Sequence, residues 1–259
     1  MNPLSEAEQF KHLTEPFSFN YGPVGCLLLH GYTSSPSEMR PLGEFLAQNG
    51  YSVICPLFPG HGTTPEDLDK TSWRDWYDAA YREFTRMRQV HKQVFIIGLS
   101  MGGVLALHIA AHSHVDGVIG LSTGTRLVDW RLTLLPLLRH FFRRVRKTHN
   151  DYARGPNRIR FAYDYNSVKP TRELLLLYQH VEDDLPEVHI PLLLIHSKND
   201  IIVDADNAEL IRSKVRSTDV SVILLEHARH IITLSEEKDA IHSAVLQFLI
   251  KYTQHPNNS

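Results

Sequence analysis

The sequence lacks long hydrophobic runs, contains few cysteines and carries little net charge. No apolar stretch approaches the ~18 residues of a membrane-spanning helix, and the first residues lack the apolar core of a signal peptide. The two cysteines, Cys26 and Cys55, fall in expected strand cores, so we expect buried free thiols. A net charge of −2 at pH 7 gives no reason to expect a nucleic-acid partner. These absences favour a soluble, reduced, cytoplasmic protein.

Short apolar runs alternate with amphipathic stretches along the chain. The runs cover residues 24–29, 51–55, 94–98, 115–121, 191–196 and 220–225. Continuous runs of this kind are typical of parallel strands that helices cover on both faces. The stretches between them predict helices over residues 35–48, 72–90, 205–215 and 235–253, and one that starts at Ser100. We therefore expect one α/β domain over residues 1–259, a doubly wound and mostly parallel sheet flanked by helices.

The first expected helix has a recognisable start. Ser35, Pro36 and Glu38 have the pattern of a capping box with proline in the first turn. We expect Glu38 to reach back toward the backbone of Ser35.

The alternation stops between about residues 124 and 188, after the strand expected near 115–121. Apolar residues at helical spacing predict helices around residues 127–145 and 171–184, with Pro136 interrupting the first and no strand between them. We expect this segment to form a small helical cap inserted above the sheet. Its residues 126–160 carry nine Arg and one Lys against two Asp, a local charge of +8. This basic face is either solvated or makes transient contact with a lipid surface.

The motif GLSMGG, residues 98–103, follows the strand expected at 94–98. The pattern G-x-S-x-G between a strand and a helix is typical of a nucleophile elbow, a sharp turn that exposes a serine hydroxyl. The glycines allow the close packing of this turn, and the helix N-terminus favours developing negative charge beside Ser100. A plain strand–helix turn is the alternative interpretation of the motif alone.

A serine hydroxyl needs a base, and the base needs a third group that orients it. In this arrangement the acid follows a late strand and the histidine follows the last one. Asp200 and His230 occupy these positions, after residues 191–196 and 220–225. The nearby alternatives are less suitable by position: Asp204 and Asp206 start a helix, His196 is still in its strand, and His227 competes with His230.

Two backbone amides are expected to stabilise the oxyanion of the reaction. One is the amide of Met101, directly after the serine. The other is the amide of Tyr32, in the turn after the first expected strand, where His30 braces the loop.

The segments LLLHGYTSSPSEMRPLGEFLAQNGY, PLFPGHGTTPEDL, GLSMGG, NDIIV and HIITLSEEKDAI resemble the α/β-hydrolases of the bacterial carboxylesterase and monoacylglycerol lipase family. The resemblance covers nearly the whole chain outside the cap. It implies the α/β-hydrolase fold, a Ser100–His230–Asp200 triad, oxyanion donors at Tyr32 and Met101, and an acyl-enzyme intermediate. The implied substrates are short- to medium-chain acyl esters, including monoacylglycerols.

The cap is expected to supply the acyl pocket through Leu134, Leu138 and Phe141, although these residues could simply pack on the sheet. The family resemblance makes Asp164 a candidate for recognising a glycerol head group. The same site could instead serve an amidase, a peptidase or a carbon–carbon bond hydrolase, and a non-catalytic ligand-binding protein is a further alternative.

No cofactor or metal is expected. The H-x-x-H formed by His227 and His230 has no third ligand of comparable quality, and among sixteen histidines chance pairs are common. The basic segment resembles no nucleic-acid-binding module.

Overall fold

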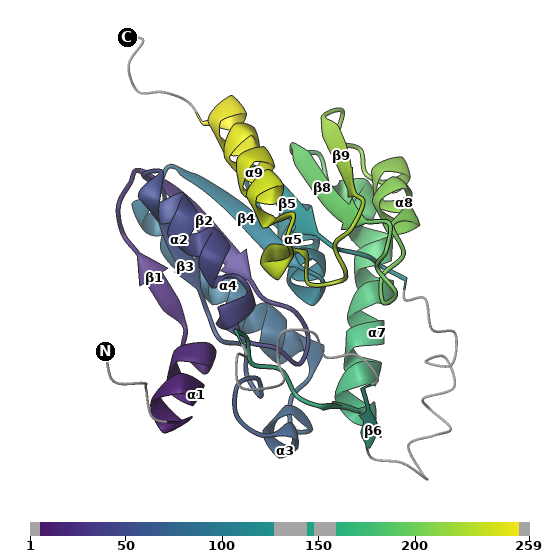
Figure 1. The fold of residues 1–259 in the computed structure, drawn as a ribbon. Coiled ribbons are helices and arrows are strands. Elements are labelled where there is room, and N and C mark those ends of the chain that lie inside the picture. Colours follow the sequence, from purple (N-terminus) through teal and green to yellow (C-terminus); the bar gives the residue numbers. More distant parts are fainter. Residues whose placement is uncertain (1–5, 127–143, 148–158, 254–259) are drawn as a thin grey trace.

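The structure, a computed structural model, describes residues 6–126, 144–147 and 159–253 (Figure 1). Its centre is a seven-stranded sheet with the strand order β1-β3-β2-β4-β5-β8-β9. The strands are β1 (Phe17–Phe19), β2 (Val24–Leu29), β3 (Ser52–Cys55), β4 (Gln93–Leu99), β5 (Gly117–Leu121), β8 (Leu192–Ser197) and β9 (Val220–Leu225). All pairs are parallel except the edge pair β1–β3.

Helices cover both faces of the sheet (Figure 1). One face carries α2 (Arg40–Gln48) and α9 (Lys238–Tyr252), whose apolar residues share a core cluster with Leu28, Ile97 and Ile195. The opposite face carries α4 (Trp73–Val90), α5 (Met101–His112) and α8 (Asp206–Lys214). The predicted doubly wound α/β architecture is confirmed.

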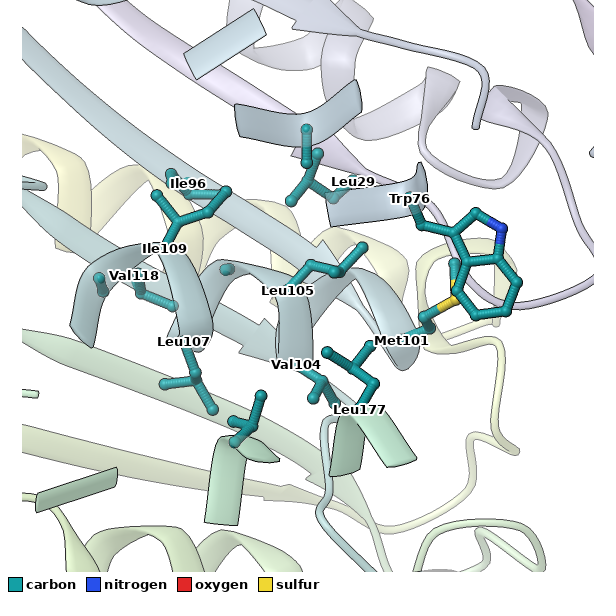
Figure 2. Close-up of a cluster of buried hydrophobic side chains, with 14 of the residues drawn as sticks. Leu29, Trp76, Ile96, Met101, Val104, Leu105, Leu107, Ile109, Val118 and Leu177 are labelled. Carbon is teal, nitrogen blue, oxygen red and sulfur yellow. The ribbon is translucent and has the colours of Figure 1, made fainter. Parts of the chain in front are cut away.

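The core on the α4–α5 side centres on helix α5, as Figure 2 shows. Its side chains pack against strands β2, β4 and β5, against α4, and against α7 (Val168–Asp184). The labelled members are Leu29, Trp76, Ile96, Met101, Val104, Leu105, Leu107, Ile109, Val118 and Leu177, all of them 0% exposed. Burial on nearly every side makes α5 a rigid support for the residue that precedes it.

All six predicted strands are present, each within two residues of its expected bounds. The edge strand β1 was not predicted, because it has three residues and no continuous apolar run. Short helices α1 (Glu6–Thr14) and α3 (Pro65–Leu68) were also not predicted. The helix expected over 235–253 is α9, which begins three residues later than expected and follows the 3₁₀ turn η4 (Ile232–Leu234).

The inserted segment differs from its prediction in one respect. It contains two short strands, β6 (Arg144–Arg146) and β7 (Tyr165–Ser167), which pair antiparallel, so the expectation of no strand there was wrong. Three-residue strands with polar sequences carry no periodicity that could reveal them. The helix expected at 171–184 is α7, which continues into η3 (Leu185–Glu187).

The helix expected over 35–48 is divided into η1 (Pro36–Glu38) and α2. Ser35 does cap this start, since its hydroxyl accepts from the Ser37 amide. The predicted capping box is nevertheless wrong, because the Glu38 carboxylate turns into the protein and accepts from the Gly31 amide.

Candidate active site

Ser100 lies in the tight turn between β4 and α5. Its backbone has φ 53° and ψ −116°, a left-handed conformation that few non-glycine residues adopt. The flanking glycines are required by space: a Cβ at Gly98 would lie 2.2 Å from the Gly102 carbonyl carbon, and one at Gly102 would lie 2.1 Å from the Leu29 carbonyl oxygen. The turn therefore presses strand β4 and helix α5 together and directs the serine side chain beyond the strand end.

The structure brings three of the predicted site residues into one hydrogen-bonded series. The Nε2 atom of His230 lies 3.0 Å from Ser100 Oγ, and its Nδ1 atom lies 2.7 Å from Asp200 Oδ2. Asp200 follows β8 and His230 follows β9, so parallel strands deliver both to the edge where β4 delivers Ser100. Only 12% of the His230 side chain is exposed and none of the Asp200 side chain.

Asp200 is held as a carboxylate. Burial alone would raise its pKa, but the neighbouring His230 ring and two backbone amides outweigh that effect and lower the pKa below its usual range. The amides are those of Ile202 and Val203, which donate to Oδ1 at 2.8 and 3.1 Å. The other carboxylate oxygen is thereby left facing His230 Nδ1, which fixes the ring so that Nε2 points to the serine.

The alternative residues occupy other positions. His227 is exposed, and Asp204 and Asp206 lie in the turn where α8 begins. His196 is fully buried, and burial lowers its pKa to about 4.

The loop after β2 lies against the turn at Ser100, and buried hydrogen bonds that involve Glu38 and Arg160 hold it in place. Glu38 is completely buried and accepts hydrogen bonds from the Gly31 amide through Oε1 and from the Ser34 hydroxyl through Oε2. Arg160 donates to the same Oε2 atom at 2.9 Å from the inserted segment, and its side chain is only 7% exposed. A buried ion pair thus fixes the residue that precedes Tyr32.

His30 braces this loop from the other side, as its position suggested. Its ring Nε2 accepts from the Phe58 amide at 3.1 Å, and Nδ1 lies 2.9 Å from the Gly31 carbonyl oxygen. Burial lowers the pKa of His30 to about 4, so the ring is neutral at pH 7 and can accept at one nitrogen while donating at the other.

The two expected oxyanion donors belong to segments next to Ser100: Met101 follows it directly, and Tyr32 follows Gly31, where a Cβ would lie 3.7 Å from that of Ser100. Met101 is the first residue of α5, where a helical amide has no partner within its own helix, and its side chain is anchored in the core (Figure 2). Tyr32 follows the braced Gly31, and its hydroxyl lies 3.1 Å from the Thr171 hydroxyl of α7.

Tyr178 of α7 is a site residue that the sequence did not reveal. It is 2% exposed, and the Ser100 side chain beside it partly offsets the strong upward effect of burial on its pKa. In the sequence it matched the apolar face of an amphipathic helix, so its spacing indicated only packing.

Of the predicted pocket residues, the structure describes only Asp164. Leu134, Leu138 and Phe141 lie outside the described residues. Asp164 is exposed, and its carbonyl oxygen accepts from the Lys147 amide at 2.9 Å, just before β7. Its neighbour Tyr163 packs inward and donates to the Gly60 carbonyl oxygen at 2.8 Å.

Comparison with known proteins identifies the family of the chain. Residues 25–238 match the family described as serine aminopeptidase, S33. The chain belongs to this family of α/β-hydrolases. A thermostable monoacylglycerol lipase of Bacillus sp. (strain H-257) is 31% identical over 255 residues, which are 95% of this chain and 99% of that protein. A carboxylesterase of Bacillus subtilis (strain 168) is 24% identical and covers 92% of this chain and 96% of its own.

Solved structures share the fold over almost the whole chain. One of them, described with LipS and LipT, two metagenome-derived lipolytic enzymes, superposes with a TM-score of 0.86 at 30% identity over 92% of this chain and 98% of that one. A soluble variant of the Saccharomyces cerevisiae monoglyceride lipase has a TM-score of 0.76 at 21% identity, over 93% of this chain and 91% of its own. The predicted resemblance to bacterial carboxylesterases and monoacylglycerol lipases is confirmed. Within the described ranges, no helix has the length and apolar character needed to cross a membrane.

Proposed function

We propose that the protein hydrolyses carboxylic esters of short- to medium-chain acyl groups, including monoacylglycerols, with Ser100 as nucleophile. The observation that supports this most directly is the series from Asp200 Oδ2 through His230 to Ser100 Oγ, with separations of 2.7 and 3.0 Å. A serine in this setting can lose its proton to the ring as it attacks a carbonyl carbon. The relatives named as a monoacylglycerol lipase and a carboxylesterase support an ester as the substrate.

In the acylation step, Ser100 Oγ bonds to the ester carbonyl carbon while His230 Nε2 accepts the hydroxyl proton. The carbonyl oxygen gains the negative charge, and the amides of Met101 and Tyr32 donate hydrogen bonds to it. When the tetrahedral intermediate collapses, the bond to the alcohol oxygen breaks and His230 returns the proton to that oxygen. The alcohol leaves and the acyl group stays on Ser100.

In the deacylation step, a water molecule replaces the alcohol. The water oxygen attacks the acyl carbon while His230 accepts a proton from the water. His230 then donates that proton to Ser100 Oγ. The carboxylic acid leaves and the serine is restored. Asp200 stays ionised throughout, because its lowered pKa reflects stabilisation by the His230 ring and two amides despite burial.

The inserted segment is proposed to be the cap that forms the acyl pocket. Leu134, Leu138 and Phe141 are its proposed apolar lining, and Asp164 its proposed contact to a glycerol head group. The hydroxyl pair of Tyr32 and Thr171 ties α7, which belongs to this segment, to the loop at the serine. The basic face of the segment could also hold the protein transiently at an anionic lipid surface.

An amide substrate is the second candidate, because the matching family is described as serine aminopeptidase. An ester and an amide differ in the leaving group that His230 must protonate, and the triad alone does not distinguish them.

A panel of substrates tests the proposal. We expect turnover of p-nitrophenyl esters with two to ten acyl carbons and of monoacylglycerols, with much slower turnover of the matching anilides. Ser100→Ala lowers kcat by about 10⁴-fold or more on every active substrate. Anilide hydrolysis that exceeds ester hydrolysis would contradict the ester proposal. Activity of Ser100→Ala equal to that of the wild type would contradict a mechanism with Ser100 as nucleophile.

A further inference from the structure

A second cluster of chemically active side chains lies at the far end of α5. His108 and His112 of α5 meet Asp184, the last residue of α7. His108 Nδ1 lies 2.6 Å from Asp184 Oδ2, and His112 Nε2 lies 3.3 Å from Asp184 Oδ1. One ligating atom from each of the three residues falls within 4.8 Å of the others.

The helical spacing explains why these side chains converge. Residues four apart on a helix lie on the same face, so His108 and His112 point in one direction from α5. That direction is toward α7, which packs along α5 and brings Asp184 opposite both rings. The burial is graded: the exposed fraction of the side chain is 12% for His108, 20% for Asp184 and 49% for His112.

The position of His108 is set by further contacts. Its ring lies 4.7 Å from that of Tyr77 and 5.7 Å from that of Trp73, both from α4, as measured between centroids. Three helices therefore hold this imidazole in place before any ligand arrives. The partly exposed His112 leaves an opening from solvent.

We propose that His108, His112 and Asp184 bind a first-row divalent transition ion, with Zn²⁺ as the representative, and that water completes the coordination. Two imidazole nitrogens and one carboxylate oxygen form a donor set that suits Zn²⁺, whereas Mg²⁺ and Ca²⁺ favour all-oxygen sites. Bonds of about 2.0–2.1 Å in a tetrahedron separate neighbouring ligand atoms by about 3.3 Å. The pair His112 Nε2 and Asp184 Oδ1 already has a separation of 3.3 Å.

Metal binding requires two adjustments of the side chains. The Nδ1–Oδ2 pair of His108 and Asp184 has to widen from 2.6 Å, and His112 has to turn inward. His112 is half exposed and ends its helix, so its side chain has room to rotate. The aspartate carries the negative charge that neutral imidazoles lack, which leaves one net positive charge on the bound ion for solvent to stabilise.

This site is separate from the proposed active site. His108 and His112 lie 8 and 12 residues beyond Ser100, roughly 12 and 18 Å along the helix axis at about 1.5 Å per residue. Its effect is structural: the ion joins the end of α7 to α5. Because α7 also carries Tyr178, which is buried beside Ser100, the ion fixes a helix that contributes to the surroundings of the serine.

Zinc titration of the full chain, freed of metal by chelator dialysis, tests the proposal. Calorimetry is expected to give one Zn²⁺ per chain in the wild type and at least tenfold weaker binding in His112→Ala and Asp184→Asn. The matched control is His114→Ala, which removes an exposed histidine two residues further along and keeps wild-type affinity. In parallel, Co²⁺ is expected to give the visible absorption of a four-coordinate site in wild type and His114→Ala, and none in His112→Ala.

Two further measurements distinguish a loss of metal binding from a loss of folding or of esterase activity. Zn²⁺ raises the melting temperature of the wild type but not of His112→Ala, whose metal-free melting temperature stays close to that of the wild type. Ester hydrolysis by metal-free His112→Ala equals that of the metal-free wild type, since the cluster does not contact Ser100. No zinc uptake by the wild type, or equal affinity in wild type and His112→Ala, overturns the proposal.

Discussion

At the scale of single residues, the proposed site depends on how firmly the Ser100 side chain is aimed. Its backbone is strained at φ 53°, and its hydroxyl has two neighbours, His230 and Tyr178. The Ser100 hydroxyl lies 3.0 Å from His230 Nε2, and Tyr178 approaches the same hydroxyl from α7. We expect the two neighbours together to limit the rotamers of the serine side chain and so to orient the nucleophile for attack.

Tyr178→Phe tests this arrangement. The change removes one hydroxyl and keeps the buried ring, so we expect the fold to be retained. If the interaction between the two hydroxyls is worth one hydrogen bond of about 1–1.5 kcal/mol, its loss predicts a 5- to 12-fold lower kcat/KM for a short-chain ester. Tyr163→Phe is the matched control, because its hydroxyl bonds Gly60 and Thr63 away from the serine. Equal kinetics of Tyr178→Phe and wild type would contradict a role in aiming Ser100.

The sequence predicted the convergence of Ser100, Asp200 and His230 because their order and strand-end positions leave few alternatives. Tyr178 was not predictable in the same way. A tyrosine at helical spacing among Leu174 and Val181 indicates a core residue, and only the packing of α7 on the elbow reveals its second contact.

At the scale of elements, the important feature is the loop after β2 and the carboxylate beneath it. Glu38 joins the Gly31 amide, the Ser34 hydroxyl and the Arg160 guanidinium in a completely buried setting. The sequence pattern assigned this glutamate to a capping box. That assignment failed because a buried arginine 122 residues further along competes for the carboxylate.

Glu38→Gln is expected to weaken both stability and catalysis. It removes the carboxylate from the buried ion pair with Arg160, at a cost of about 3–5 kcal/mol in the free energy of unfolding. If the loop holds the Tyr32 amide for the transition state, kcat falls about tenfold or more while KM changes less than threefold.

Urea unfolding and steady-state kinetics check these values. Glu209→Gln is the control, since it breaks the exposed Arg212 pair and should change the unfolding free energy by less than about 1 kcal/mol. A Glu38→Gln protein with altered KM and unchanged kcat would show that the loop binds substrate without serving the transition state.

The strands were predicted well because continuous apolar runs are typical of strands buried on both faces. Five of the six predicted strands are buried in this way, whereas β9 lies at the edge of the sheet and is only partly buried. The strands β1, β6 and β7 have three residues each, too few for any period to appear. Their positions follow from pairing with segments far away in the chain, which local sequence does not encode.

At the scale of the whole molecule, several buried histidines link stability to pH. Burial lowers the pKa of His30 and His196 to about 4 and that of His61 to about 3. In the unfolded chain such rings take up protons near pH ~6.5. Between these values the unfolded state binds more protons than the folded state, so the free energy of unfolding falls as pH falls.

We expect a decrease of about 2–4 kcal/mol in the free energy of unfolding between pH 7 and 5.5. The decrease continues until about pH 4, where His30 and His196 also take up protons in the folded state. Urea unfolding followed by circular dichroism at several pH values measures it. His114→Ala, which removes an exposed histidine, should show the same slope. A free energy that stays constant over this interval would contradict three neutral buried rings.

Packing between segments far apart in the chain explains which features the sequence did not predict. In the cluster of His108, His112 and Asp184, the aspartate lies 72 or more positions after both histidines, and only the packing of α7 along α5 brings the three together. The pocket residues Leu134, Leu138 and Phe141 lie outside the described residues and stay predictions. By contrast, the sheet and its flanking helices follow from a repeated local pattern, which is why the architecture was predictable as a whole.

The most direct test of the central claim is covalent labelling of Ser100 by a fluorophosphonate, followed by intact mass measurement and peptide mapping. We expect one adduct per chain, formed on Ser100 Oγ with loss of fluoride, none on Ser100→Ala, and labelling at least ~100-fold slower on His230→Ala. Labelling of Ser100→Ala at the wild-type rate, or of His230→Ala at an unchanged rate, would contradict it.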